Sequence, residues 1–168
     1  DRRQRRRVEL VQQGQRVPVV IWLHPYGHAT GYSQQGRPAI EALVQRGFAV
    51  LAFDQIGFGT RIHQQREFYR RYPHWSLLGK MVADTRAAVA AVRALGEIDP
   101  AKVYLAGFSL GARVALWTAA QEPNVAAVAM AGGYHPVKLS TADDGSEGIR
   151  HFSHLHGLLP RMGFFLGR

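Results

Sequence analysis

The residues best suited to chemistry in this chain form the sequence GFSLG at positions 107–111. A serine between two glycines, with a short apolar run before it and a helix-like run after it, is the pattern of a nucleophile elbow. The glycines leave room for the strained, positive-φ turn that such a serine adopts. The turn presents the Ser109 hydroxyl at the carboxyl end of a strand, beside a helix N-terminus. Ordinary turns also contain these residue types, so the neighbouring elements must decide between the two interpretations.

The apolar runs around the motif alternate with helix-like runs. Four apolar runs predict strands: residues 19–23, 48–53, 103–106 and 125–130. We expect the first, second and fourth of them to be buried. Helix-like runs cover residues 38–46, 76–95 and 112–120. The longest helix has a stripe suited to burial at Leu78, Val82, Val89 and Val92. Strands alternating with helices predict parallel βαβ units and an α/β sandwich.

Several single residues carry structural expectations. Gly47 follows the first helix and is expected to cap its C-terminus. Asp54 follows the second strand and is expected to cap the tight turn at residues 57–59 through backbone N–H groups. On the helix after the elbow, we expect Arg113 to pair with a carboxylate and Trp117 to lie in the core.

Three motifs occur in a fixed order: HPYG at residues 24–27, DQIGFG at 54–59 and GFSLG at 107–111. Together they resemble the core of an α/β-hydrolase, most closely the dienelactone-hydrolase and acetyl-xylan-esterase branch. The resemblance spans roughly residues 17–133. It implies an α/β-hydrolase-type three-layer sandwich with a mostly parallel sheet, and a single domain over residues 1–168. It implies no cofactor.

The resemblance also implies roles for individual residues. Ser109 would be the nucleophile, and the backbone N–H of Leu110 would be one donor of the oxyanion hole. Related esterases take the second donor from a His-Gly-Tyr or His-Gly-Gly loop after the first of these strands. Pro25 occupies the middle position here and has no N–H. Tyr26 is therefore the expected second donor, with Gly27 as the alternative.

The same loops supply the candidate substrate pocket, which we assign to His24, Gly27 and Phe108. The Tyr26 side chain would also be available to line an acyl or alcohol site. For His24 we favour packing and orientation of the loop over a role as catalytic base, because the resemblance places the base near the C-terminus.

The catalytic acid and histidine should follow the serine in sequence. After Met130 no run predicts another buried strand, so we expect a sheet truncated after the strand that follows the elbow. The chain would then be a fragment, or one of two pieces that associate. Local candidates for the acid and the base are Asp143, Asp144, Glu147, His151, His154 and His156. Whether these histidines are catalytic, part of a lid or on the surface stays open.

The composition narrows the classes of protein. With 46% hydrophobic and 20% charged residues, the 168-residue chain is typical of one globular domain rather than a disordered one. No apolar run reaches about 18 residues, so no membrane span is expected. The absence of cysteine excludes disulfides and leaves secreted, periplasmic and cytoplasmic locations open. The chain has neither an HExxH motif nor cysteine, so no metal site is expected.

The net charge of +9 is concentrated in two basic groups. The first contains Arg2, Arg3, Arg5, Arg6 and Arg7. It lacks interleaved aromatic residues, so nucleic-acid binding is a weak alternative. The second contains Arg61, Arg66, Arg70 and Arg71, mixed with Phe68, Tyr69, Tyr72 and Trp75. It suits the mouth of a site for an anionic or sugar-bearing substrate, or equally a surface excursion with its aromatic rings in the core.

The leading hypothesis is a serine carboxylic-ester hydrolase that acts on small or carbohydrate-linked acyl esters through an acyl-enzyme. A peptidase or a lactone hydrolase is an alternative, because the core does not encode the leaving group. A non-catalytic hydrolase-like module that binds a partner chain through an open sheet edge is the alternative from a different class.

Overall fold

The strands in the described part of the chain form one parallel sheet. The computed structural model describes residues 14–27 and 37–133. Its strands are β1 (Val17–Leu23), β2 (Ala49–Ala52), β3 (Ile98–Phe108) and β4 (Ala127–Ala131). They lie in the order β2-β1-β3-β4, and each neighbouring pair is parallel. The expected α/β class is therefore confirmed.

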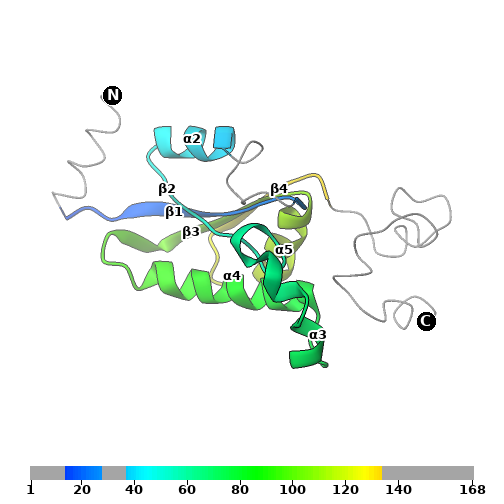
Figure 1. Ribbon diagram of the computed structural model, residues 1–168. Helices are drawn as coiled ribbons and strands as arrows, with labels where there is room; N and C mark the ends of the chain where they lie inside the picture. The colour runs from blue at the N-terminus through cyan, green and yellow to red at the C-terminus, as the bar shows by residue number, and fades with distance from the viewer. Residues whose placement is uncertain (1–13, 28–36, 134–168) are drawn as a thin grey trace, which may run out of the picture.

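Helices cover both faces of the sheet and make three layers (Figure 1). The helices are α2 (Arg37–Gln45), α3 (Phe68–Arg71), α4 (Leu77–Arg93) and α5 (Leu110–Ala119), with a 3-10 helix η1 (Gly59–Gln65). α2 packs on one face, against Val20 and Trp22 of β1. α4 and α5 pack on the other face, against Ile21 of β1 and Leu105 of β3. Alternate β1 side chains thus enter opposite layers, as the two-residue period of a strand requires.

The strand order creates a switch point between β1 and β3. From β1 the chain crosses through α2 to β2 on one side, and the following strand, β3, returns to the other side of β1. In open parallel sheets, ligands bind where the carboxyl ends of such strands diverge. β1 ends at the HPYG loop and β3 ends at the GFSLG motif, so the fold brings both motifs to that place.

Local sequence signals explain where α4 begins and where α2 ends. Ser76 caps α4, and its hydroxyl accepts the Gly79 N–H at 2.9 Å. Leu78, Val82, Val89 and Val92 are buried along α4, as the periodicity predicted. Gly47 ends the α2 segment with a φ of +91°, and its N–H donates to the Val44 carbonyl at 3.0 Å. The expected C-terminal cap is confirmed.

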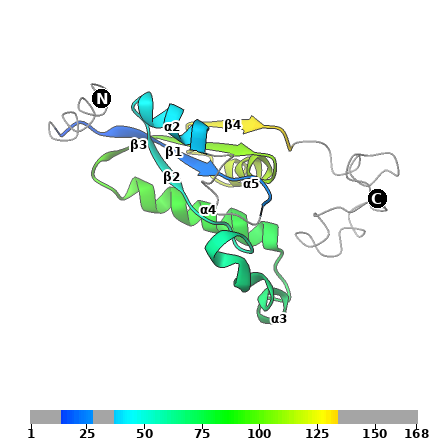
Figure 2. The same ribbon diagram turned by 45° about the horizontal axis from the view of Figure 1, so that its top comes forward.

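Two strands are less buried than the sequence predicted. β2 is half-buried along its length, and four of the five β4 residues are exposed. Both strands are edges of the described sheet, so one side of each lacks a neighbouring strand among these residues. In β4, Val128 packs toward the core of α4 and α5, which leaves Ala127, Ala129 and Ala131 on the face that α2 leaves uncovered. β4 runs along the sheet edge in Figure 2.

The expectation that Trp117 lies in the core is wrong, because this side chain is 48% exposed on α5. The aromatic residues interleaved with the second basic group differ in burial, so neither of the two interpretations of this segment holds for all of them. Phe68 is buried, whereas Tyr72 and Trp75 are exposed. No described helix is long and apolar enough to cross a membrane.

The exposed β4 edge predicts self-association. An apolar edge strand with open hydrogen-bonding groups pairs readily with another strand. We expect the 168-residue chain to form oligomers in sedimentation-velocity experiments, and Ala129→Lys to shift it toward monomer. Ala90→Lys, on the exposed face of α4, is the matched control and should leave the distribution unchanged. A soluble, cooperatively folding monomer at all concentrations would contradict the prediction.

Candidate active site

Ser109 sits in a sharp turn between β3 and α5. Its φ of 53° and ψ of −113° make it the one non-glycine residue with a positive φ in the described parts of the chain. Such a conformation costs on the order of 1–3 kcal/mol and persists only where the surroundings enforce it. The Ser109 N–H donates to the Ala131 carbonyl of β4 at 2.9 Å. The side chain is half-buried and makes no capping hydrogen bond to α5, so its hydroxyl is not committed to the helix.

The two glycines of the motif are required by close approach. A Cβ on Gly107 would collide with the backbone of Gly111 and Ala112. A Cβ on Gly111 would collide with the carbonyl group of Leu23, at the end of β1. The first turn of α5 therefore lies directly against both β3 and the start of the HPYG loop, which is possible only without side chains at these positions.

The residue expected to donate to an oxyanion, Leu110, lies at the start of α5. Leu110 is the first residue of α5, so its N–H has no acceptor within the helix. The positive end of the helix dipole lies at the same place. This amide is therefore positioned to stabilise negative charge that develops beside Ser109.

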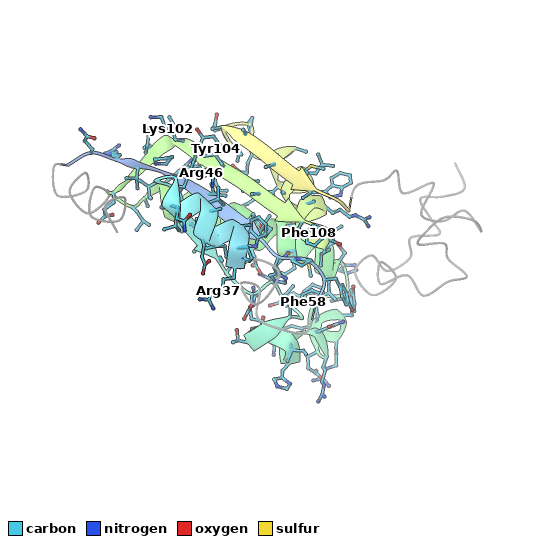
Figure 3. The ribbon with its side chains drawn as sticks, turned by 90° about the horizontal axis from the view of Figure 1, so that it is seen from above. Arg37, Arg46, Phe58, Lys102, Tyr104 and Phe108 are labelled. Carbon is cyan, nitrogen blue, oxygen red and sulfur yellow. The ribbon has the colours of Figure 1, made fainter. Side chains whose placement is uncertain are left out.

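The HPYG loop begins level with the elbow. Leu23 of β1 pairs with Gly107 of β3, which puts His24 alongside the last residue of β3. Tyr26 is 40% exposed, and its ring meets Phe58 edge-on at a centroid distance of 4.9 Å. Phe58 and Phe108 lie at the same end of the sheet in Figure 3. Tyr26 and Phe58, from the loops after β1 and β2, thus lie at the same end of the sheet as Phe108, the last residue of β3.

His24 is a buried, fully engaged side chain. It is 2% exposed, and its Nδ1 lies 2.8 Å from the Pro25 carbonyl oxygen. Its Nε2 accepts the backbone N–H of Gln55 at 3.1 Å, so Nδ1 carries the proton and donates. The Gln55 side-chain amide donates in turn to the His24 carbonyl at 3.3 Å. Both ring nitrogens are used to hold the loop, which leaves neither for the Ser109 proton.

Burial lowers the pKa of His24 below its usual 6.5, and this effect outweighs the raising effects of the bond to Pro25 and of nearby Asp54. The ring is therefore held neutral, as the bond from Gln55 to Nε2 requires. Sequence patterns place Gln55 in the DQIGFG motif but do not reveal its role, because its two contacts with His24 span 31 positions.

Asp54 serves the turn that follows β2. Its Oδ2 accepts the Thr60 N–H at 2.9 Å and the Thr60 hydroxyl at 2.8 Å. Gly59 has a φ of +49°, and a Cβ there would collide with the Asp54 carboxylate. Arg61 donates to the Asp54 carbonyl oxygen at 3.2 Å. The expected structural role of this carboxylate, capping through a backbone N–H, is confirmed.

Other candidates are not joined to the serine within the described residues. No histidine in residues 14–27 and 37–133 is hydrogen-bonded to the Ser109 hydroxyl. Nor do three His, Cys, Asp or Glu side chains come together there as metal ligands. The proposed acids and bases lie outside the described residues: Asp143, Asp144, Glu147, His151, His154 and His156.

The lowered pKa of His24 predicts a pH dependence of stability. The folded state keeps this ring neutral at pH values where the unfolded chain is already protonated, so the unfolded state binds more protons. The free energy of unfolding should therefore fall as the pH drops from about 6.5 toward the folded-state pKa. Urea titrations across this range should show a smaller fall for His24→Gln. His63→Gln, at an exposed position, should keep the dependence of the unsubstituted chain. An unchanged slope in His24→Gln would refute the assignment.

The contact at Gly111 predicts that Gly111→Ala is destabilising. The new methyl group would meet the Leu23 carbonyl, and either the helix start or the HPYG loop would have to move. We expect a loss of about 1–3 kcal/mol in the free energy of unfolding. Gly96→Ala is the control, because nothing lies within 4 Å of a Cβ at that position. Equal stability of the two variants would show that the elbow tolerates a wider separation.

Solved structures share this fold. The dienelactone hydrolase from Anabaena variabilis ATCC 29413 is 25% identical, with a TM-score of 0.54 over 68% of this chain and 51% of that one. Est1E from Butyrivibrio proteoclasticus, solved with ferulic acid bound, is 23% identical, with a TM-score of 0.53 over 67% of this chain and 41% of that one. Both likenesses bear out the α/β-hydrolase fold.

Sequence comparison points the same way. The quorum-quenching protein AidA of Acinetobacter baumannii (strain MDR-ZJ06) is 35% identical over 113 residues. That match covers 67% of this chain and 34% of AidA, so it spans about a third of the relative's length. The model of the family described as serine aminopeptidase, S33, matches residues 14–160, and the chain belongs to this family of α/β-hydrolases.

Proposed function

We propose that the chain is the core of a serine-dependent carboxylic-ester hydrolase with Ser109 as its nucleophile. The observation that carries the proposal is the strained Ser109 turn at the switch point, directly before the N-terminus of α5. A non-glycine residue at positive φ is costly, and such strain concentrates at functional sites. The half-buried hydroxyl and the adjacent helix N-terminus suit attack on an acyl group.

In the proposed reaction, the Ser109 oxygen attacks the acyl carbon of the ester while its proton passes to a histidine base. The oxyanion of the tetrahedral intermediate accepts hydrogen bonds from the backbone N–H groups of Leu110 and Tyr26. Protonation and departure of the alcohol leave an acyl-enzyme, which water then cleaves by the same route. We assign the base to His151, His154 or His156, or to a chain that associates with this one.

The substrate we propose is a small or carbohydrate-linked acyl ester. The exposed rings of Tyr72 and Trp75 support a carbohydrate-linked substrate, because aromatic faces pack well against sugar rings. Arg70, in the same excursion, is paired with Glu67 at 2.6 Å, so its charge is partly balanced. The exposed rings, rather than Arg70, therefore favour a carbohydrate-linked ester.

A lactone hydrolase is the second candidate function. The relative of known structure at 25% identity is a dienelactone hydrolase, and AidA is described as quorum-quenching. The family description also names a serine aminopeptidase, which keeps an amide substrate as a third possibility. Parallel assays of acyl esters, lactones and aminoacyl amides, each repeated with Ser109→Ala, rank the three. A serine-dependent rate that is largest on lactones would favour the second candidate over the first.

The assignment of the nucleophile predicts covalent labelling. After incubation with a fluorophosphonate probe, intact-mass analysis should show one adduct on the unsubstituted chain and none on Ser109→Ala. Ser76→Ala removes a serine that caps α4 and should keep the adduct. No adduct on a folded sample of the unsubstituted chain would mean that the elbow is not activated, and the partner-binding module would then be favoured.

A further inference from the structure

A buried arginine lies one helical turn behind the elbow. Arg113 of α5 is 8% exposed. Its Nε and Nη2 both donate to the carbonyl oxygen of Gly133, at 3.3 and 3.1 Å. Gly133 belongs to the segment that leaves β4, twenty positions further along the chain. A buried guanidinium with two bonds to one carbonyl fixes that carbonyl in both distance and direction.

The segment that Arg113 holds is pressed against the strained serine. Gly132 and Gly133 have φ values of +64° and +73°, so the chain turns sharply as it leaves β4. A Cβ on Gly133 would collide with the carbonyl group of Ser109. Just before this turn, the Ala131 carbonyl accepts the Ser109 N–H at 2.9 Å. The end of β4 therefore contacts the peptide groups on both sides of the Ser109 Cα.

These contacts form a closed circuit around the elbow. Ser109 is joined to Ala131 by its amide, the chain continues to Gly133, and Arg113 ties Gly133 back to the helix that Ser109 begins. Loss of either hydrogen bond, from Ser109 to Ala131 or from Arg113 to Gly133, would let the Ser109 turn relax toward an ordinary negative φ, because local strain persists only where several contacts enforce it. The GFSLG motif supplies only the space for the turn, whereas this circuit supplies the restraint.

We propose that Arg113 is a positioning residue, which holds the Gly132-Gly133 turn against the elbow and thereby keeps Ser109 in its strained conformation. The catalytic meaning of this role rests on the proposed function of Ser109 as nucleophile. The role in fixing the backbone does not rest on that function, and the two can be tested separately.

The test of the backbone role is amide hydrogen exchange in Arg113→Gln, measured for peptides that cover residues 107–113. Loss of the charged donor should speed exchange at the elbow by about tenfold or more, because a hydrogen bond to a charged group contributes more than a neutral one. Arg113→Lys should give a smaller increase, because its ammonium lacks the planar pair of donors. Arg86→Gln, which removes an exposed arginine of α4 paired with Glu122 at 2.7 Å, should leave these peptides unchanged.

A merely structural role would give a different pattern. If Arg113→Gln only lowered global stability, exchange would rise together in the central strands β1 and β3 and at the elbow, and this result would overturn the proposal. Unchanged exchange at residues 107–113 would also overturn it. Arg113→Lys keeps the test decisive if Arg113→Gln fails to fold, since equal protection in the lysine variant and the unsubstituted chain counts against the role.

The fluorophosphonate labelling rate connects the circuit to chemistry. We expect Arg113→Gln to slow labelling of the folded protein by about tenfold, in line with the loss of one positioned interaction, and Arg86→Gln to have no effect. Equal labelling rates in Arg113→Gln and the unsubstituted chain would overturn the positioning role while leaving the nucleophile assignment intact. If the unsubstituted chain is not labelled, the nucleophile assignment fails, and the exchange experiment still decides the backbone role.

Discussion

The close approach of α5 to the ends of β1 and β3 is the constraint on which the rest of the site depends. Gly107 and Gly111 face one another and the Leu23 carbonyl with no room for a Cβ. Because strand and helix come so near, the single residue that links the last position of β3 to α5 must make a sharp turn. Ser109 makes this turn with a φ of 53°, and the contacts from the end of β4 hold it in that conformation. The helix N-terminus is brought to the serine by the same contact.

The first loop is fixed by a second, independent interaction. His24 and Gln55 exchange two hydrogen bonds between segments that follow β1 and β2, in a place with almost no access to water. Buried polar groups of this kind are costly when unpaired, so the pair defines one loop geometry rather than several. Since Phe58 packs on both His24 and Tyr26, the same loop sets where the Tyr26 backbone lies relative to the elbow.

Much of this fold can be predicted from the sequence, because local patterns report on local structure. The periodicity of α4, the Gly47 cap and the order of the three motifs predict the layers and the helix ends, whereas the strand order and its switch point come from the structure. Burial at the sheet edges cannot be predicted in the same way. The Ala-Val-Ala-Met-Ala run of β4 has the same composition whether or not a further strand covers it. The burial prediction for Trp117 is wrong for a related reason. Whether an apolar residue on a helix is buried depends on the elements that pack against that helix, and the local sequence does not identify them.

The contacts of Gly133 show what kind of information lies beyond sequence patterns. A Gly-Gly pair after a strand suggests a turn, but only the three-dimensional structure shows that the turn contacts Ser109 and Arg113.

The contacts at the elbow also link two properties of β4. The strand with the largest exposed share of its residues in the described sheet, four of five in β4, carries the Ala131 carbonyl that accepts the Ser109 amide. An edge strand opens more readily than a central one, because fewer bonds restrain it. Pairing of a further strand with β4 would therefore restrain the elbow as well as the sheet.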